Sequence, residues 1–313
     1  MKTKFTFLTL ICAIISTSTS LAAEKGCSAN YSSLVLDERT GDILYGKRSD
    51  EQFYPASLVK VMTLYLTFEA LEKNQLTMDK ELTISELGEE ISRVNKTNSL
   101  HLKVGNKITV RDAIFSVIVK SFNEAAVTLA ETVGGNEWNF VRLMNEKAAE
   151  LGMINTSFRN ASGLHAEGQY TTSYDLARLA IAIKRDFPQY YHLFALKEFK
   201  YRGTKYETHN HVLVDYKGAE GMKTGFTKAS GFNLITSAKR QDRRIISVLL
   251  GCATQQRRDK LTKELLNESF ENLEKPKIYP QLEAKLSKAF NYDVKEEGAA
   301  NRGEICEPLA VIP

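Results

Sequence analysis

The segment 53–68 constrains the fold more than any other part of the chain, because it reads as a helix with no polar face. From Ser57 onward its side chains are apolar or small almost all the way round, which is typical of a helix buried on every side. Pro55 suits the first turn, since its missing N–H and fixed φ cost nothing there. We therefore expect the core to be built around this helix.

Lys60 is the only charged residue in the stretch 57–68. A lone ammonium inside an apolar helix is costly unless it is paired or loses its proton through a lowered pKa. Ser57 stands one turn earlier, so the hydroxyl and the amine share one face. Serine, any two residues, then lysine is expected about once by chance in a chain of this length. Burial nevertheless makes this pair a candidate for an activated serine nucleophile.

Composition excludes several classes of function. The 313 residues suggest one large or two smaller domains, and the net charge of +4 is modest. No basic block and no zinc-ligand spacing occur, so we expect no nucleic-acid partner. His209 and His211 could be read as a metal pair, but no carboxylate or cysteine stands at a matching spacing. We expect neither a metal nor a cofactor.

Residues 1–23 have the pattern of a secretory signal peptide. Lys2 and Lys4 precede an apolar core at 5–15, and small residues at Ala22 and Ala23 offer a cleavage site. The apolar core is too short to span a bilayer in the usual way. The protein is therefore predicted to be exported to the periplasm or cell envelope. Cys27, Cys252 and Cys306 remain after cleavage, an odd number that cannot all pair internally.

Local patterns predict a helix-rich middle between strands. Thr109 to Asp112 and Thr172 to Asp175 read as capping boxes, and Asn123 reads as an N-cap. The short connections between the last three predicted strands make those strands antiparallel neighbours. We expect a hairpin at 31–45, helices at 113–119, 124–132, 138–151 and 172–185, strands at 221–227, 232–238 and 244–250, and a helix at 255–270.

Two further motifs add to the serine–lysine pair. Ser121 and Asn123 sit at a bend between two apolar helices, where both side chains can point to one side; alone this is an ordinary helix break. Lys223, Thr224 and Gly225 lie on a predicted strand, whose edge can bind an extended peptide through its backbone. Gly225 permits close approach, and Lys223 supplies a positive charge for a carboxylate.

The three motifs, in this order, resemble the signature of the penicillin-recognising serine enzymes. Segments 55–63, 151–164, 170–177 and 221–227 are similar to the low-molecular-weight D-alanyl-D-alanine carboxypeptidases, and the resemblance covers about 30–272. It implies an α+β fold of the β-lactamase/transpeptidase type: three α/β/α layers around an antiparallel sheet, with an inserted, mostly helical region. Phe122 departs from the glycine that is common in the second motif.

The resemblance also implies a mechanism and partners. Ser57 would attack the carbonyl between two D-alanines of a peptidoglycan stem peptide, and neutral Lys60 would take its proton. The N–H groups of Ser57 and Phe226 would form the oxyanion hole. β-Lactam antibiotics would be covalent inhibitors. Ser121 would relay a proton, and Asn123 would orient the substrate amide. The substrate strand and its terminal carboxylate would be bound by Lys223, Thr224, Gly225 and Arg258.

Other readings remain open at this stage. An endopeptidase would cut the cross-link between stems with the same residues. A β-lactamase needs a deacylating base, and Glu167 lacks the Glu-x-x-x-Asn context of one class. A stem-peptide receptor on a dead enzyme fold would bind without covalent labelling. The predicted division is a signal peptide at 1–23, a catalytic domain at 24–272 and a short tail at 273–313 without a second domain. Membrane association stays open.

Overall fold

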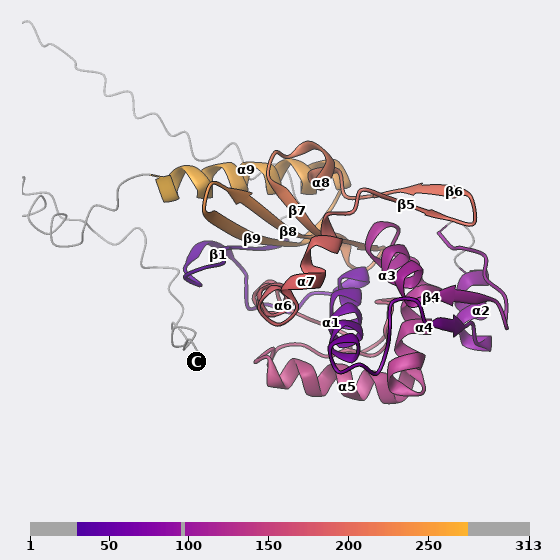
Figure 1. Ribbon diagram of the computed structural model, residues 1–313. Helices are drawn as coiled ribbons and strands as arrows, with labels where there is room; N and C mark the ends of the chain where they lie inside the picture. Colours follow the sequence, from indigo (N-terminus) through magenta and orange to yellow (C-terminus); the bar gives the residue numbers. More distant parts are fainter. Residues whose placement is uncertain (1–29, 95–97, 275–313) are drawn as a thin grey trace, which may run out of the picture.

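The computed structural model describes residues 30–94 and 98–274 (Figure 1). The predicted signal peptide and a weakly amphipathic helix predicted at 281–294 lie outside the described residues, as does almost all of the predicted tail.

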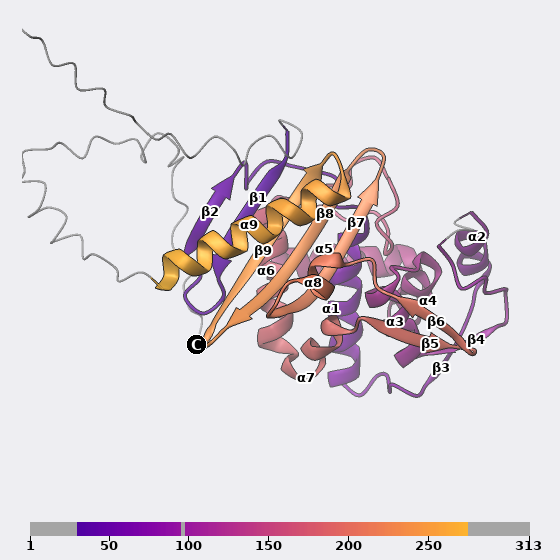
Figure 2. The same cartoon turned by 90° about the horizontal axis from the view of Figure 1, so that it is seen from above.

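A five-stranded antiparallel sheet joins the two ends of the described chain. Its order is β2 (Ile43–Lys47), β1 (Ser32–Asp37), β9 (Arg243–Cys252), β8 (Gly231–Arg240) and β7 (Ala219–Thr227) (Figure 2). Each neighbouring pair is antiparallel, as predicted for the hairpin and for the last three strands. β7 therefore lies at the edge of the sheet, with one side open to a further strand.

Helices cover both faces of this sheet, which confirms the predicted three-layer α+β fold (Figure 1). On one face lie α9 (Gln255–Glu274) and the short α8 (His211–Asp215). On the other lie α6 (Ser173–Asp186) and α1 (Val59–Glu72), the helix predicted to be buried all round. Of the fourteen residues in α1, twelve are buried, so this helix is the centre of the larger core.

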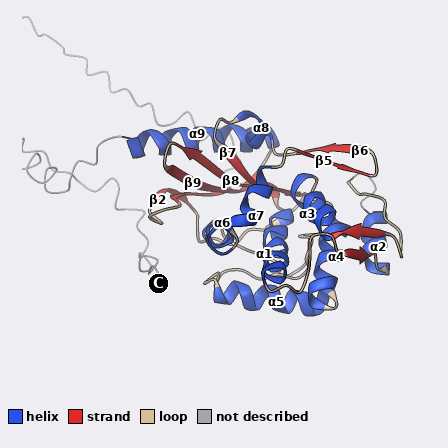
Figure 3. Ribbon diagram, viewed as in Figure 1, coloured by secondary structure: helices blue, strands red, loops and turns tan. Residues whose placement is uncertain are grey.

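The inserted region packs beside α1 and is mostly helical (Figure 3). The sequence predicts no helix or strand in the irregular stretch before Lys107 or in the polar stretch 192–216. Both stretches contain short elements. The elements of the inserted region and of the connection back to β7 are β3 (Glu81–Thr83), α2 (Glu86–Val94), β4 (Lys107–Thr109), α3 (Val110–Val119), α4 (Asn123–Gly134), α5 (Glu137–Glu150), α7 (Pro188–Tyr191), the 3-10 helix η3 (His192–Ala195), β5 (Glu198–Tyr201) and β6 (Thr204–Glu207).

Two of the three predicted N-caps are confirmed and one is wrong. The Thr109 and Thr172 hydroxyls accept hydrogen bonds from the amides three residues on, at 3.1 and 3.0 Å. Asn123 does not cap α4; it is the first residue of that helix, and Phe122 holds the cap position without a side-chain bond. The Asn123 side chain instead accepts a hydrogen bond from Lys60, a buried partner that no local pattern reveals.

Cys252 ends β9 and is disulfide-bonded, and the other cysteines of the chain lie outside the described residues. Among the residues described, no helix combines the length and the apolar character needed to cross a membrane.

Candidate active site

The serine–lysine pair is formed as the helix geometry predicts. A 3-10 turn, η2 (Ala56–Leu58), leads directly into α1, so Ser57 sits at the helix start. Lys60 is completely buried, and its Nζ lies 3.1 Å from Ser57 Oγ and 2.7 Å from Asn123 Oδ1. It also makes a short hydrogen bond to the carbonyl oxygen of Ser162. Within residues 30–94 and 98–274, none of the hydrogen-bond partners of this amine is a carboxylate.

Burial lowers the pKa of Lys60 well below its usual value, and the nearby Lys223 lowers it further, against a smaller opposing effect of Glu124. A neutral amine has two N–H groups and one lone pair. Asn123 and the Ser162 carbonyl offer two acceptors, which leaves the lone pair for the hydroxyl proton of Ser57. The arrangement thus suits a general base acting on a serine nucleophile.

The loop that carries Ser162 approaches the nucleophile so closely that a glycine is required. Gly163 has φ +78°, and a Cβ there would stand 1.9 Å from the carbonyl oxygen of Ala56. Both the backbone conformation and the space therefore exclude a side chain. This contact places the Ser162 carbonyl against Lys60, a role that motif reading did not reveal, although Ser162 and Gly163 belong to a segment that resembles the family.

The bend between α3 and α4 brings the second motif to the site. Ser121 has φ +63°, and its buried Oγ makes no hydrogen bond within the described part of the chain. Its neighbour Phe122 is turned into the core, where its ring meets the edge of Tyr206 at a centroid distance of 5.4 Å. Ser121 faces the cavity, whereas Asn123 binds Lys60 behind it.

The third motif lies on β7 beside the nucleophile. A Cβ on Gly225 would stand 3.1 Å from the Pro55 carbonyl oxygen and 3.2 Å from the Ser57 amide nitrogen, so the strand nearly touches the helix start. Lys223 is buried, its Nζ donates to the Thr224 carbonyl at 2.9 Å, and its pKa is lowered to about 7 by burial and by Arg258. Phe226 is half exposed and stacks on Phe232.

Arg258 enters the site from the second turn of α9. It is 2% exposed, its Nε and one terminal nitrogen donate to Asp259 Oδ1 at 2.9 and 2.6 Å, and the other terminal nitrogen lies 3.3 Å from the Asn233 carbonyl. Burial lowers the pKa of its guanidinium, against the opposing effect of Asp259. Arg258 thus borders the cavity as a buried cation that is paired with Asp259.

One cavity of about 340 Å³ unites the predicted residues. Six of the nine line it, while Lys60, Asn123 and Lys223 lie directly behind these lining groups. The complete lining is Ser57, Asn98, Ser121, His209, Thr224, Gly225, Phe226, Phe232, Gln255 and Arg258.

Four residues that line the cavity are not among the site residues predicted from the sequence: Asn98, His209, Phe232 and Gln255. His209 was considered only as a metal ligand, but its Nε2 lies 2.6 Å from the Nζ of Lys120. Burial, followed by the charge of Lys120, lowers the pKa of His209 to about 4, so its imidazole is neutral at pH 7. No cluster of three His, Cys, Asp or Glu side chains suited to a metal occurs in residues 30–94 and 98–274.

A buried serine–lysine pair at the start of a central helix, beside the edge strand of an antiparallel sheet, defines the class of penicillin-recognising serine enzymes. The model of the D-alanyl-D-alanine carboxypeptidase family, peptidase family S11, matches residues 19–254. The chain belongs to this family of serine peptidases.

Individual relatives agree with this placement. The D-alanyl-D-alanine carboxypeptidase DacF of Bacillus subtilis is 33% identical over 79% of this chain and 64% of its own length. The structure of penicillin binding protein 5 from Haemophilus influenzae is 34% identical, covers 77% of this chain and 70% of its own, and has a TM-score of 0.73. Penicillin-Binding Protein D2 from Listeria monocytogenes, in its ampicillin-bound form, is 31% identical over 76% of this chain and 96% of its own, with a TM-score of 0.68. The chain spans about three fifths of the length of DacF of Bacillus subtilis and of DacC and DacD of Escherichia coli.

Proposed function

We propose that the protein is a serine-type D-alanyl-D-alanine carboxypeptidase that removes the terminal D-alanine from peptidoglycan stem pentapeptides. The observation that carries this proposal is the 3.1 Å contact between Ser57 Oγ and a fully buried Lys60 amine, which has no carboxylate partner in the described part of the chain. Membership of the carboxypeptidase family supports the reaction class.

Acylation follows from the positions of five residues. Lys60 takes the hydroxyl proton as Ser57 Oγ bonds to the carbonyl carbon between the two D-alanines. The amides of Ser57 and Phe226 flank that carbonyl and stabilise the oxyanion. The C–N bond then breaks, and Lys60 returns the proton to the leaving D-alanine amine through the Ser121 hydroxyl, which lines the same cavity and is free of other bonds in the described chain. Asn123 fixes the base and orients the substrate amide.

The terminal carboxylate is bound at the wall of the cavity formed by β7 and the start of α9. Thr224 and Arg258 line that wall, and Lys223 lies directly behind Thr224. A carboxylate held there forms charge-assisted hydrogen bonds, which are stronger than neutral ones. The substrate then lies along the open edge of β7 as an additional strand.

Deacylation completes the cycle with water. Lys60 takes a proton from the water as the water oxygen attacks the ester carbonyl, and Ser57 regains its proton when the ester bond breaks. No Asp or Glu lines the cavity among the residues described, and Glu167 is exposed on the neighbouring loop. This lining favours a slowly deacylating peptidase, with β-lactams as covalent inhibitors, over a β-lactamase.

Labelled penicillin tests the nucleophile. We expect one adduct per chain, located at Ser57 by peptide mass mapping, and no adduct in Ser57→Ala, with circular dichroism showing that the variant is folded. An adduct on another residue would refute the assignment of Ser57. Complete absence of labelling in the wild type would favour the stem-peptide receptor.

Muropeptide digestion tests the reaction. A carboxypeptidase releases D-alanine from monomeric pentapeptides, which mass spectrometry detects as the loss of one alanine residue. An endopeptidase instead converts cross-linked dimers into monomers. If dimers are cleaved and pentapeptides are not, the alternative function replaces the one proposed.

Location belongs to the same proposal. A reaction on peptidoglycan requires export, in agreement with the signal peptide expected at 1–23, and places the enzyme in the periplasm or cell envelope. An N-terminus at Ala23 or Glu24 on protein recovered from the cell envelope is the expected result, and an intact Met1 would contradict it.

A further inference from the structure

A buried asparagine that has no part in the proposed chemistry lies beside the reaction centre. Asn233 belongs to β8, is fully buried, and is the cross-strand partner of Gly225 on β7. Its side-chain nitrogen donates to the carbonyl oxygens of Tyr54 and Pro55 at 2.9 and 3.1 Å. Its side-chain oxygen accepts from the Gly251 amide at 2.9 Å. Both donor hydrogens of the amide are thus used, and the side chain connects β8, β9 and the segment before η2.

The pairing with Gly225 explains how this side chain reaches the segment. Residues that face each other across two strands lie on the same face of the sheet. On that face a Cβ at Gly225 would stand 3.1 Å from the Pro55 carbonyl oxygen and 3.2 Å from the Ser57 amide nitrogen. The glycine therefore lets the helix start approach β7, and Asn233 reaches the same carbonyl from the next strand. One glycine and one amide fix the spacing between the helix start and β7.

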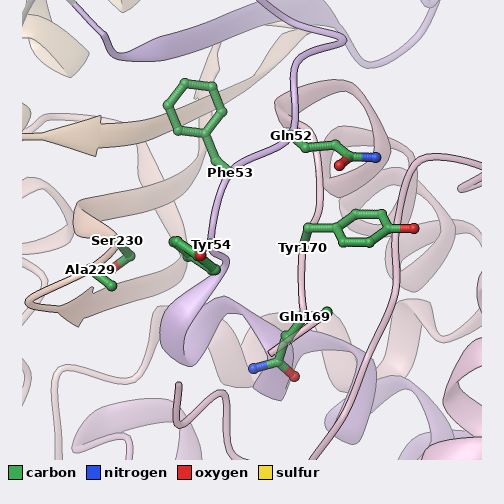
Figure 4. A pocket seen from close by; sticks show the side chains of 8 residues that line it. Gln52, Phe53, Tyr54, Gln169, Tyr170, Ala229 and Ser230 are labelled. Atoms are coloured by element: carbon green, nitrogen blue, oxygen red, sulfur yellow. The ribbon is translucent and has the colours of Figure 1, made fainter. Parts of the chain in front are cut away.

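The segment held in this way is strained. Ala56, which is buried and directly precedes Ser57, has φ +49°, a left-handed conformation that is unfavourable for a residue with a side chain. Such a conformation persists only where the surrounding contacts hold it. Phe53 lies on the segment that enters this turn (Figure 4), and its backbone N–H and C=O both bond to Thr171. The two carbonyls that follow Phe53 are those that the Asn233 side chain binds.

The sheet is irregular at the same position. The register of β8 against β9 shifts between Phe232 and Leu234, and the Asn233 side chain accepts there from Gly251. Irregularities of this kind re-aim side chains and are common next to active sites. The backbone carbonyl of Asn233 also accepts from Arg258 at 3.3 Å. Asn233 therefore contacts both the segment before the nucleophile and the cation beside the cavity.

The proposed oxyanion hole lies across this junction. One of its amides belongs to Ser57, directly after Ala56, and the other belongs to Phe226, directly after Gly225. Hydrogen-bond donors stabilise an oxyanion most when they are already fixed at the right distance from it. A shift of the helix start relative to β7 would change the separation of these two amides.

We propose that Asn233 is a positioning residue that sets the separation of the two oxyanion-hole amides. It acts through the Tyr54 and Pro55 carbonyls and does not itself line the cavity. The inference rests on the proposed function, because the oxyanion belongs to the proposed acylation step. A residue that only supported the fold would change stability without changing the rate at which each folded molecule is acylated.

Two substitutions of similar size separate the donors of Asn233 from its acceptor. Asn233→Leu removes both, whereas Asn233→Asp keeps an oxygen for the Gly251 amide and leaves at most one donor for the two carbonyls. We expect the first-order rate constant of acylation by penicillin to fall about thirtyfold in both variants, which corresponds to about 2 kcal/mol. This constant is measured on the molecules that react, so a partly unfolded sample still gives it.

The acyl-enzyme gives a direct readout of the hole. Hydrogen bonds to the ester carbonyl lower its infrared stretching frequency, so displaced amides should raise that frequency in both variants. Peptides with a free and with an amidated terminal carboxylate should lose kcat/KM equally, because both form the oxyanion. Equal losses distinguish this effect from loss of a contact between Arg258 and the carboxylate.

A buried residue of the same strand provides the matched control. Thr236 is as buried as Asn233, and its hydroxyl makes no hydrogen bond within the described residues, so Thr236→Val should change neither the rate nor the frequency. An unchanged frequency, or an acylation rate of Asn233→Asp within about threefold of the wild type, would overturn the positioning role and leave the carboxypeptidase intact. A wild-type protein that takes no label and releases no D-alanine would overturn the proposed function, and the positioning role with it.

Discussion

At the scale of single residues, the proposed chemistry depends on two buried lysines, Lys60 and Lys223. Burial in the low-dielectric core lowers the pKa of both side chains. Their proposed roles nevertheless require opposite charge states. Lys60 must be neutral to accept a proton, whereas Lys223 must be charged to attract a carboxylate. Arg258, the cation beside Lys223, makes the second requirement harder to meet as the pH rises.

The opposing requirements predict a bell-shaped pH profile. Raising the pH deprotonates Lys60, whose pKa is well below the usual value, and acylation gains its base. Further increase removes the proton of Lys223 near its pKa of about 7, and the carboxylate loses a cation. kcat/KM for a D-alanyl-D-alanine peptide should therefore fall above about pH 7. An analogue with an amidated terminus should lack this falling limb, and identical profiles for both substrates would contradict the assignment.

Coupling between the two lysines gives a second prediction. Because the Lys223 charge lowers the pKa of Lys60, Lys223→Met should raise that pKa and move the rising limb of the acylation profile to higher pH. The rate of penicillin acylation measured from pH 4 to 10 shows the position of the limb. A lower rate with an unmoved limb would mean that Lys223 acts on the substrate alone.

Arg258 carries a third prediction at this scale. Its guanidinium borders the cavity, and a charge-assisted contact with the terminal carboxylate is lost in Arg258→Ala. We expect a loss of about 2–4 kcal/mol in transition-state binding, roughly 30- to 1000-fold in kcat/KM, for the free acid and a much smaller loss for the amide. Arg257→Ala, at the exposed neighbouring position, is the matched control. Equal losses on acid and amide would show that Arg258 only supports the fold.

The candidate site shows where sequence reasoning succeeds and where it stops. Ser57 and Lys60 are readable because one helix fixes both, and Lys223 to Phe226 are readable because one strand does. His209 is different, since its contact with Lys120 joins residues that are 89 positions apart in the chain. The residues next to it in sequence indicate only a weak metal-binding pattern. The cavity that it faces is formed by tertiary contacts, which the local sequence does not reveal.

At the scale of elements, locally encoded features were predictable and long-range ones were not. The Thr109 and Thr172 caps bond within three residues, so the local pattern suffices. Asn123 has the sequence of a cap, but the buried Lys60 takes its side chain, because an amine in the core needs acceptors. The hairpin β5–β6 was missed because each of its strands has only four residues and more than half of them are polar, which leaves too short an apolar pattern to read.

The cap of α6 gives a prediction about an element. Thr172→Ala removes the hydroxyl that accepts from the Asp175 amide, leaving a buried donor without its partner. We expect the free energy of unfolding to fall by about 1 kcal/mol, within the range of about 0.5–2 for such caps. Urea denaturation measures the change. Thr172→Ser keeps the oxygen and should recover most of the stability; if it loses as much as the alanine variant, packing of the methyl group is responsible instead.

At the scale of the whole molecule, the sheet joins the start and the end of the described chain, and α9 covers that junction. Leu266 and Phe270 of this helix pack in one cluster with Val35 from β1 and with Ile245 and Leu249 from β9. The smaller core therefore joins residues from the start and the end of the described chain. Through Ala238 the cluster also holds β8 against the helix that carries Arg258, and β8 in turn pairs with β7, the wall of the proposed site.

Loosening this core should destabilise the whole described domain. Leu266 is fully buried, so Leu266→Ala leaves a cavity and should lower the free energy of unfolding by about 2–5 kcal/mol. Because β1 and β9 form one sheet with β7, we expect the unfolding transition followed by circular dichroism and the loss of penicillin labelling at Ser57 to shift together along the urea axis. Glu268→Ala, on the exposed face of the same helix, should shift neither. Loss of labelling well before the circular dichroism signal would instead show that the site opens as an independent unit while the sheet remains folded.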